Sequence, residues 1–534
     1  MATLLGQCHE VLHEILSNVL PGDLSNLSLS CKSFHTYIDG NWLLWRDVYL
    51  KNFDNPLIAS QSDKIDWEDQ LKRITTLEKL LKAEDKSIGD TELQACCETI
   101  SQLAITASLQ YESSNNVKFL ESQLSQKDNK NLFILASNLF DVAREQKSTK
   151  SQALSNALAK VHCLYGTGAD QLRSTGPHIN KDAPPVRAHP YARSRVYDLR
   201  LYTEETKWGP WSDDGSMAVD WEKVECIMID LAFNFQYITD RTHALMDVPW
   251  RVPFKGAQAG SYVDTLREEA PQLQSSSQDS QNDGLSVLLG QPDPSLDALD
   301  PYGVTGNWQR IVCFLDYSDF YYFNFSSVPP LTQRRPANYF QEAIRLILMR
   351  LHVTKIEKQG AGDMPIVHFK GTSRSMHQGW DPTSTSAIKG TVQLTPEKEV
   401  RWSTISTFQG EARWRSEGVQ VGGIRSGRGV FGNWFEKDHD ENGPAGPTAM
   451  WKITDQIDKN NSLTWRRCPH GGIQLASEGV EIAMPDLQSD PNETSDDEWE
   501  EVSESEEVIE EEPEEESTHS SSDIESKASG SGTS

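Results

Sequence analysis

The chain has 534 residues and a formal net charge of -29, and it is long enough for two or three domains with a sizeable core. Residues 490–525 contain 18 Asp or Glu and no Lys or Arg, so this segment alone supplies -18 and the rest carries -11. The folded part is therefore only mildly acidic. This argues against a nucleic-acid surface, which needs clustered Lys and Arg to displace counterions from phosphates.

The spacing of apolar residues in 8–53 predicts three short helices. Apolar residues recur at helical spacing, and Pro21-Gly22-Asp23 separates the first helix from the second. About 45 residues are too few for a good core of their own, so one apolar face is expected to pack on another protein. The alternative is an ordinary helical subdomain packed on its own chain. The stripes are Leu12, Ile15, Leu16 and Val19; Leu24, Leu27 and Cys31; and Trp42, Trp45, Val48 and Tyr49.

Residues 65–165 have the apolar spacing of further helices, with breaks near residues 85–90 and 128–130. We predict an antiparallel helical layer that supports the N-terminal helices against the C-terminal half of the chain. Residues 166–195 contain many Pro and Gly and predict a linker or an extended loop.

From Val196 the chain becomes rich in Tyr, Trp, Phe and Val with Gly and Pro between, which is typical of strands. So many strand-like segments favour a barrel or a sandwich. One helix is predicted among them, at residues 339–351, where apolar side chains cover a wide helical face. The predicted strands are VYDLRLY, VECIMIDLAF, WQRIVCFLDYSDFYYFNF, MPIVHFKGTS, KGTVQLTP, EVRWSTISTF, ARWRSEGVQVGGI and GVFGNWFEKD.

The composition of two segments predicts that they are disordered. Residues 268–300 are rich in Ser, Gln, Asp and Pro and have no aromatic residue, and residues 486–534 are acidic and rich in Ser. Neither composition can bury enough apolar surface to fold alone.

Patterns that often indicate chemistry have structural explanations in this chain. Residues 427–432 read G-x-G-x-x-G, but a strand rather than a helix follows, which predicts a hairpin turn. Residues 438–443 open like a calcium loop, yet Ala449 stands where the bidentate Glu belongs. The eight cysteines form no C-x-x-C pair, and no catalytic Ser-His-Asp or Cys-His order stands out. We therefore expect no catalytic residue, no metal site and no cofactor.

The N-terminal sequence and the lengths of the apolar runs bear on where in the cell the protein is expected. The N-terminus lacks the basic stretch and the apolar core of a signal peptide, and no run approaches 18 apolar residues. We expect no membrane partner and a cytoplasmic or nuclear location, where cysteines stay mostly reduced.

The 15 tryptophans are distinctive, because four of them fall in successive strand-like segments and two of these four have arginines beside them. Strand periodicity puts Arg413 and Arg415 on one face and Trp414 on the other. One interpretation is that the tryptophans fill the barrel and the arginines face water. The other is a mouth that grips a peptide, because Trp, Tyr and Arg dominate binding hot spots. The candidate substrate-binding residues are Arg401, Trp402, Trp414, Glu417 and Trp434.

The spacing of the first helices resembles that of an F-box. F-boxes dock a Skp-type adaptor on a cullin–RING ubiquitin ligase, and the resemblance implies this role here. Cys8-His9 departs from the pattern, which opens with leucine-proline. The matching positions are Glu10, Leu12, Glu14, Ile15, Leu16, Pro21, Asp23, Leu24, Leu27, Ser28, Cys31, Lys32, Phe34, Trp45 and Tyr49. The implied adaptor-binding residues are Leu12, Ile15, Leu16, Pro21, Leu24, Leu27, Ser28 and Cys31.

Residues 390–453, with the pieces at 209–234 and 339–357, resemble a family of fungal F-box proteins. With the N-terminal helices, this resemblance spans residues 5–455. The same C-terminal region is loosely similar to the lipocalin-like barrel of the animal F-box receptor for cyclin D. That similarity favours a barrel over a sandwich.

We therefore predict a multidomain α+β chain with an F-box at 5–55, a helical spacer at 65–165, an antiparallel β-barrel-like recognition domain at 190–485 and a disordered tail. The predicted function is the non-catalytic substrate-recognition subunit of a Skp–cullin–F-box ubiquitin ligase. Its partners would be the adaptor, the cullin and an unidentified target protein. Two alternatives stay open: an F-box scaffold outside ubiquitination, and a barrel that binds a small ligand and signals through the F-box.

Overall fold

The computed structural model describes residues 7–56, 65–167, 187–242, 248–262, 296–360, 363–375, 385–440 and 442–454, and the short strands β9 (Thr464–Arg467) and β10 (Ile473–Ala476). These residues belong to one compact unit, Met1–Ile482. The predicted tail at 486–534 lies outside the described residues. The predicted insertion at 268–300 also lies outside them up to residue 295, and helix α14 (Leu296–Leu299) occupies its end.

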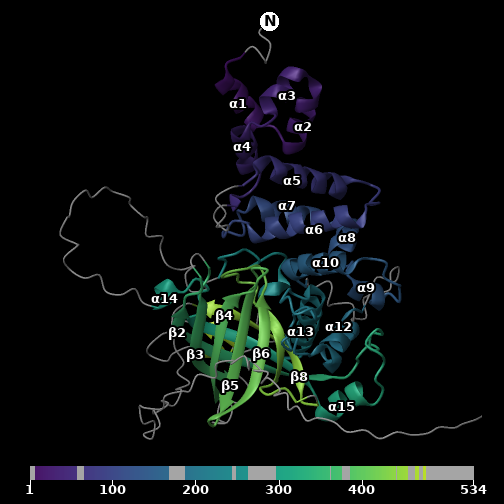
Figure 1. Cartoon of the computed structure of the whole chain (residues 1–534), viewed down its shortest axis with the longest axis vertical. Coiled ribbons are helices and arrows are strands. Elements are labelled where there is room, and N and C mark those ends of the chain that lie inside the picture. Colours follow the sequence, from purple (N-terminus) through teal and green to yellow (C-terminus); the bar gives the residue numbers. More distant parts are fainter. Residues whose placement is uncertain are drawn as a thin grey trace, which may run out of the picture. The chain divides into compact units, whose positions relative to one another are not determined.

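The N-terminal segment, residues 9–52, contains four helices rather than the three that the sequence predicts (Figure 1). The extra helix is short and follows Cys31, whose extended backbone ends the helix before it. Pro21 suits the first position of the second helix because its fixed φ fits there and it needs no N–H partner. The helices are α1 (His9–Ser17), α2 (Pro21–Ser30), α3 (Lys32–Ile38) and α4 (Trp42–Asn52).

The predicted helical region at 65–165 is helical, and its first helix contacts the second and fourth helices of the N-terminal segment. The Tyr49 ring lies 5.3 Å from that of Trp67. The carboxylate of Asp54 accepts hydrogen bonds from the backbone N–H groups of Ser108 and Asn115 at 2.8 and 3.0 Å. The helices are α5 (Trp67–Lys82), α6 (Asp90–Ile105), α7 (Asn115–Leu124), α8 (Lys127–Phe133), α9 (Asn138–Ala143) and α10 (Gln152–Tyr165).

The C-terminal strands form a closed antiparallel barrel, which confirms the predicted fold class. Each strand pairs with the next along the chain, and the first also pairs with the last, so the barrel leaves no free edge. The strands are β1 (Gly306–Leu315), β2 (Glu342–Glu357), β3 (Ile366–Ser375), β4 (Thr385–Leu394), β5 (Val400–Phe408), β6 (Glu411–Gln420), β7 (Val430–Glu436) and β8 (Ala445–Thr454).

Several predictions before the barrel are wrong, because the strands begin at Gly306 and not near Val196. The segment VYDLRLY runs from the end of α12 (His189–Val196) through a short 3-10 helix, η3 (Leu199–Leu201). VECIMIDLAF lies in helix α13 (Trp221–Thr242), and YSDFYYFNF forms helix α15 (Tyr317–Phe325). Between them lies a second 3-10 helix, η4 (Pro249–Arg251). Helix α13 is buried on nearly every side over residues 221–235, so it lacks the polar face that marks a helix in sequence.

Residues 339–351, predicted as a helix, instead contain the start of strand β2. The run is apolar on both faces because the strand is covered on both. Met349 belongs to the core inside the barrel, whereas Leu346 belongs to the core shared with the helices outside. A segment with apolar residues on both faces does not distinguish a buried strand from a helix.

Arg428, in the loop between β6 and β7, joins the helices to the barrel. Its Nη1 donates to the carbonyl oxygens of Pro249, Val252 and Lys255 at 2.8–3.0 Å. Its Nε and Nη2 donate to the carbonyls of Cys163 and Leu164 in the last turn of α10. Burial lowers the pKa of Arg428 to about 9, and the five carbonyl oxygens stabilise its buried charge.

Candidate functional site

The N-terminal segment does not expose all of the residues that the sequence assigns to an interface. The exposed fractions of Leu12, Leu16 and Leu24 are 4%, 1% and 0%, and Pro21 is also buried. These four residues form the interior of the segment, so their assignment as surface contacts is corrected. The apolar stripes predicted for the first two helices are present, but they pack largely on the segment itself, with Leu44 and Val48 of α4 in the same core.

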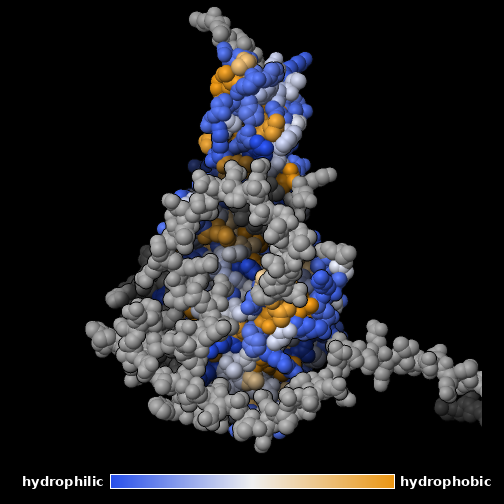
Figure 2. Space-filling model, turned by 90° about the vertical axis from the view of Figure 1, so that its left-hand side faces the viewer, coloured by the Kyte–Doolittle hydropathy of each residue, from blue (hydrophilic) through white to orange (hydrophobic). Residues whose placement is uncertain are grey.

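The other four assigned residues remain accessible. Ile15 is 42% exposed, Cys31 is exposed, and Leu27 and Ser28 are half-buried. The predicted set of adaptor-binding residues omits six more large apolar residues that this segment exposes. In Figure 2 apolar patches interrupt the hydrophilic surface of these helices. The omitted residues are Val11, Leu20, Leu29, Trp42, Leu43 and Leu50, with exposed fractions of 43%, 63%, 80%, 59%, 42% and 38%. So many exposed large apolar side chains on so small a unit mark an interaction surface.

The barrel register divides the five candidate substrate-binding residues between its two faces. Trp402 pairs with Gly418, and Ser403 pairs with Glu417. Because neighbours along a strand face opposite sides, Trp402, Trp414 and Trp434 face the interior, whereas Arg401 and Glu417 face outward. The five residues therefore do not form a single mouth, which corrects the prediction.

Glu417 is fully buried on the outer face of the barrel. Its carboxylate accepts hydrogen bonds from Arg401 Nε at 2.9 Å, Ser403 Oγ at 2.7 Å and Arg415 Nη2 at 2.8 Å. The Glu417 Cβ lies close to Gly209, where an added side chain would clash. This ion-pair network therefore fixes the barrel wall beneath the loop that contains Gly209.

Trp402 has the structural role that the sequence left open. Its side chain is 1% exposed, its ring centroid lies 4.9 Å from that of Trp308, and its Nε1 donates to Gln420 Oε1 at 3.1 Å. These residues, with the apolar side chains around them, close one end of the barrel interior.

At the other end the interior side chains are more accessible. Phe314 and Trp414 are half-buried, and Arg345 is exposed with its guanidinium 5.3 Å from the Phe314 ring. The Trp414 and Trp434 rings meet edge to face at 5.1 Å. We call the region around these residues the open end of the barrel, as far as the described residues define it. Of the predicted substrate-binding residues, only Trp414 and Trp434 therefore lie together at this end.

Helix α15 follows β1 directly at the open end and carries exposed tyrosines. Tyr317, Tyr321 and Tyr322 are 58%, 49% and 63% exposed, and Tyr339 beyond the helix is 71% exposed. The sequence assigned this stretch to a strand, so it missed this surface.

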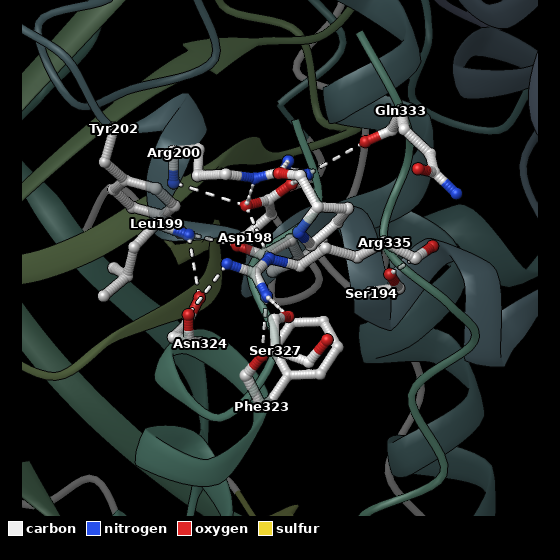
Figure 3. A network of polar contacts seen from close by, with 12 residues as sticks. Ser194, Asp198, Leu199, Arg200, Tyr202, Phe323, Asn324, Ser327, Gln333 and Arg335 are labelled. Atoms are coloured by element: carbon white, nitrogen blue, oxygen red, sulfur yellow. Dashed lines mark hydrogen bonds and ion pairs between the residues drawn. The ribbon is translucent and has the colours of Figure 1, made fainter. Parts of the chain in front are cut away.

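A buried carboxylate fixes the segment that contains α15 (Figure 3). Asp198 accepts hydrogen bonds from Arg335 Nε at 2.9 Å and Arg200 Nη2 at 2.6 Å. Arg335 also donates to the carbonyls of Phe323 and Asn324 at 2.7 and 2.9 Å. Burial raises the pKa of Asp198, but hydrogen bonds and charge from Arg200 and Arg335 lower it more, so the pKa lies below its ordinary value.

This network makes stability depend on pH. A carboxylate whose folded pKa is depressed contributes stability above its unfolded pKa of about 4 and loses that contribution as the pH falls through the folded pKa. Asp198→Asn should therefore lower the free energy of unfolding at pH 7 by about 1–3 kcal/mol and flatten the loss of stability on acidification. Thermal unfolding from pH 7 to pH 3 measures this. The exposed Asp39→Asn is the control, and an unchanged acid dependence in Asp198→Asn would contradict the assignment.

The described residues show no group of three or more His, Cys, Asp or Glu placed to hold a metal ion. Within the same residues no helix has the length and apolarity needed to cross a membrane. The loop at 438–443 that opens like a calcium site is described except for residue 441. There Asn442 N–H donates to Asp440 Oδ1 at 2.9 Å, as in a capped turn.

The exposed apolar residues belong to the N-terminal segment of four short helices, and the sequence of this segment matches a known family. Residues 9–51 match the F-box-like family model. This F-box-like domain covers α1 to α3 and most of α4, and the match agrees with the sequence resemblance. Searches of curated proteins and of solved structures found no match to the chain.

Proposed function

We propose that the chain is the substrate-recognition subunit of a Skp–cullin–F-box ubiquitin ligase. The observation that carries the proposal is the F-box-like domain at residues 9–51, which exposes large apolar side chains on a fold with its own core. Because the domain has a core without Ile15, Leu20 and Leu29, these three side chains are available to a partner. Those exposed residues are the proposed contacts with a Skp-type adaptor.

The open end of the barrel and helix α15 are the proposed site for the target protein. Trp414 and Trp434 lie inside that end, and the tyrosines Tyr317, Tyr321 and Tyr322 lie on the helix that leaves it. Trp and Tyr are enriched in binding hot spots because they offer large rigid contact areas and a polar group. The Asp198 network holds this helix in place before a target arrives.

The proposed mechanism is proximity rather than chemistry in this chain. The adaptor and cullin would bring the ubiquitin-loaded enzyme close to a target held at the barrel, which raises the effective concentration of the target lysine. Contacts between α4 and α5 and the Asp54 hydrogen bonds connect the F-box-like domain to the other helices. The proposed location is the cytoplasm, the nucleus or both, where cysteines stay mostly reduced.

The experiment is affinity purification of the full chain from cells with the proteasome blocked. Ile15→Asp combined with Leu29→Asp places two charges on the exposed surface and should reduce recovery of both adaptor and cullin at least about tenfold. Leu109→Asp is the matched control, because Leu109 is 52% exposed but lies outside the F-box-like domain. Equal recovery of both partners from all three proteins would contradict the proposal. Recovery of the adaptor without cullin from the wild type would favour the scaffold alternative.

A further inference from the structure

The barrel interior contains a buried arginine with no acidic partner among the described residues. Arg310 of β1 is 7% exposed and faces inward, because it pairs with Met450 and Ile347, which face the interior. Its Nε donates to Thr448 Oγ1 at 2.8 Å. Within the described part of the chain, no carboxylate pairs with Arg310 and no acceptor takes a hydrogen bond from its two terminal nitrogens. The buried Arg428, by contrast, donates to five carbonyl oxygens.

The charge on Arg310 persists despite its burial. Burial lowers the pKa of Arg310 to about 10, so the guanidinium remains protonated at neutral pH. Glu417, whose backbone borders the same part of the wall, turns its carboxylate outward, where Arg401 and Arg415 already pair with it. A positive charge in a low-dielectric interior is costly unless something of opposite charge accompanies it.

A small cavity lies beside Arg310. The space open to the centre of a water-sized sphere is about 10 Å³, which is enough for about one water molecule or one small group of similar size. Gly418 and Gly432 contribute no side chains to it, and Trp402 forms part of its wall. The polar lining residues are Arg310, Thr404, Ser416 and Thr448, with Glu417 in the same wall.

The hydroxyl groups around the cavity add a hydrogen-bond donor to those of the Arg310 guanidinium. Thr404 Oγ1 and Ser416 Oγ lie 2.5 Å apart, and only one of them can donate to the other. The second O–H is therefore free to donate to a further group. Thr448 Oγ1 already donates to the carbonyl of Ile311 at 2.9 Å while it accepts from Arg310. The cavity thus offers guanidinium N–H groups and a hydroxyl, while the Glu417 carboxylate on its wall is turned to the outer face.

We infer that the barrel binds a monovalent anion between Arg310 and the Thr404–Ser416 hydroxyl pair. The anion is either a free halide or a single carboxylate group, whose organic remainder would lie outside the small cavity and toward the open end. Both offer one negative charge that accepts several hydrogen bonds in a small space. This inference concerns the barrel alone and holds whether or not the F-box-like domain binds an adaptor.

The test is thermal unfolding of the full chain at constant ionic strength, in which chloride or acetate replaces a bulky sulfonate. The wild-type midpoint should rise steadily with the logarithm of anion concentration. Arg310→Met should abolish this dependence, and Arg310→Lys, which keeps the charge, should retain a weaker one. Arg413→Met is the control, because Arg413 is exposed and lies outside the cavity.

The two sources of the anion give different patterns. A halide site predicts that chloride raises the wild-type midpoint, and a carboxylate site predicts that acetate does so while chloride does not. Either result supports the inference if Arg310→Met removes it. A wild-type midpoint that responds to neither anion, or that responds as strongly in Arg310→Met as in Arg413→Met, would overturn it.

Discussion

Replacing Arg428 by Met is expected to lower the free energy of unfolding by roughly 3–5 kcal/mol. The variant removes the guanidinium that donates to five carbonyl oxygens, of which those of Cys163 and Leu164 are buried and the other three are partly buried. Two of those carbonyls end helix α10, where the helix dipole favours a cation, so the junction between helices and barrel should loosen first.

Chemical unfolding of the full chain, monitored by tryptophan fluorescence, measures this effect. Arg428→Lys should be intermediate, because a lysine keeps the charge but has three donors for five acceptors. The control is Arg413→Met, which replaces an exposed arginine and should change stability by less than about 0.5 kcal/mol. Equal stability of Arg428→Met and Arg413→Met would show that Arg428 does not hold the junction.

The second large effect is expected at Leu24, where Asp should unfold the F-box-like domain rather than disturb only its surface. The Leu24 side chain is fully buried, so the variant loses its packing and places a carboxylate in the domain interior. Together these cost on the order of 4 kcal/mol or more, which exceeds what a domain this small can supply.

Hydrogen exchange of the full chain tests this, because it reports on residues 9–52 and on the barrel separately. Leu24→Asp should abolish protection in α1 to α4 while the barrel strands stay protected. Ser25→Asp is the neighbouring control, since Ser25 is exposed on the same helix. Full protection of α2 in Leu24→Asp would mean that Leu24 is on the surface after all.

The difference between Leu24 and Leu29 shows what the sequence could and could not predict. Spacing located the helices and matched the F-box pattern, because periodicity is a local property of the chain. The same spacing does not show whether an apolar stripe packs on its own domain or on a partner. That depends on α3 and α4, which fold back over the stripe and bury Leu12, Leu16 and Leu24.

In the barrel, the alternating tryptophans and arginines predicted strands correctly, and the resemblance favoured closure. The positions of Arg401 and Glu417 outside and Trp402 inside depend on register, which pairs residues distant in sequence. Arg310 carries no motif at all. Only the closed barrel turns it inward, away from any carboxylate of the described residues, so no sequence pattern could have identified its site.

We propose that residues 9–51 bind a Skp-type adaptor of a ubiquitin ligase. Titration of the purified adaptor into the purified full chain tests this proposal most directly. We expect one-to-one binding with a dissociation constant at or below about 1 μM, weakened at least about 100-fold by Ile15→Asp with Leu29→Asp and unchanged by Leu109→Asp. No binding of the wild-type chain at tens of micromolar adaptor, or equal binding by all three proteins, would contradict it.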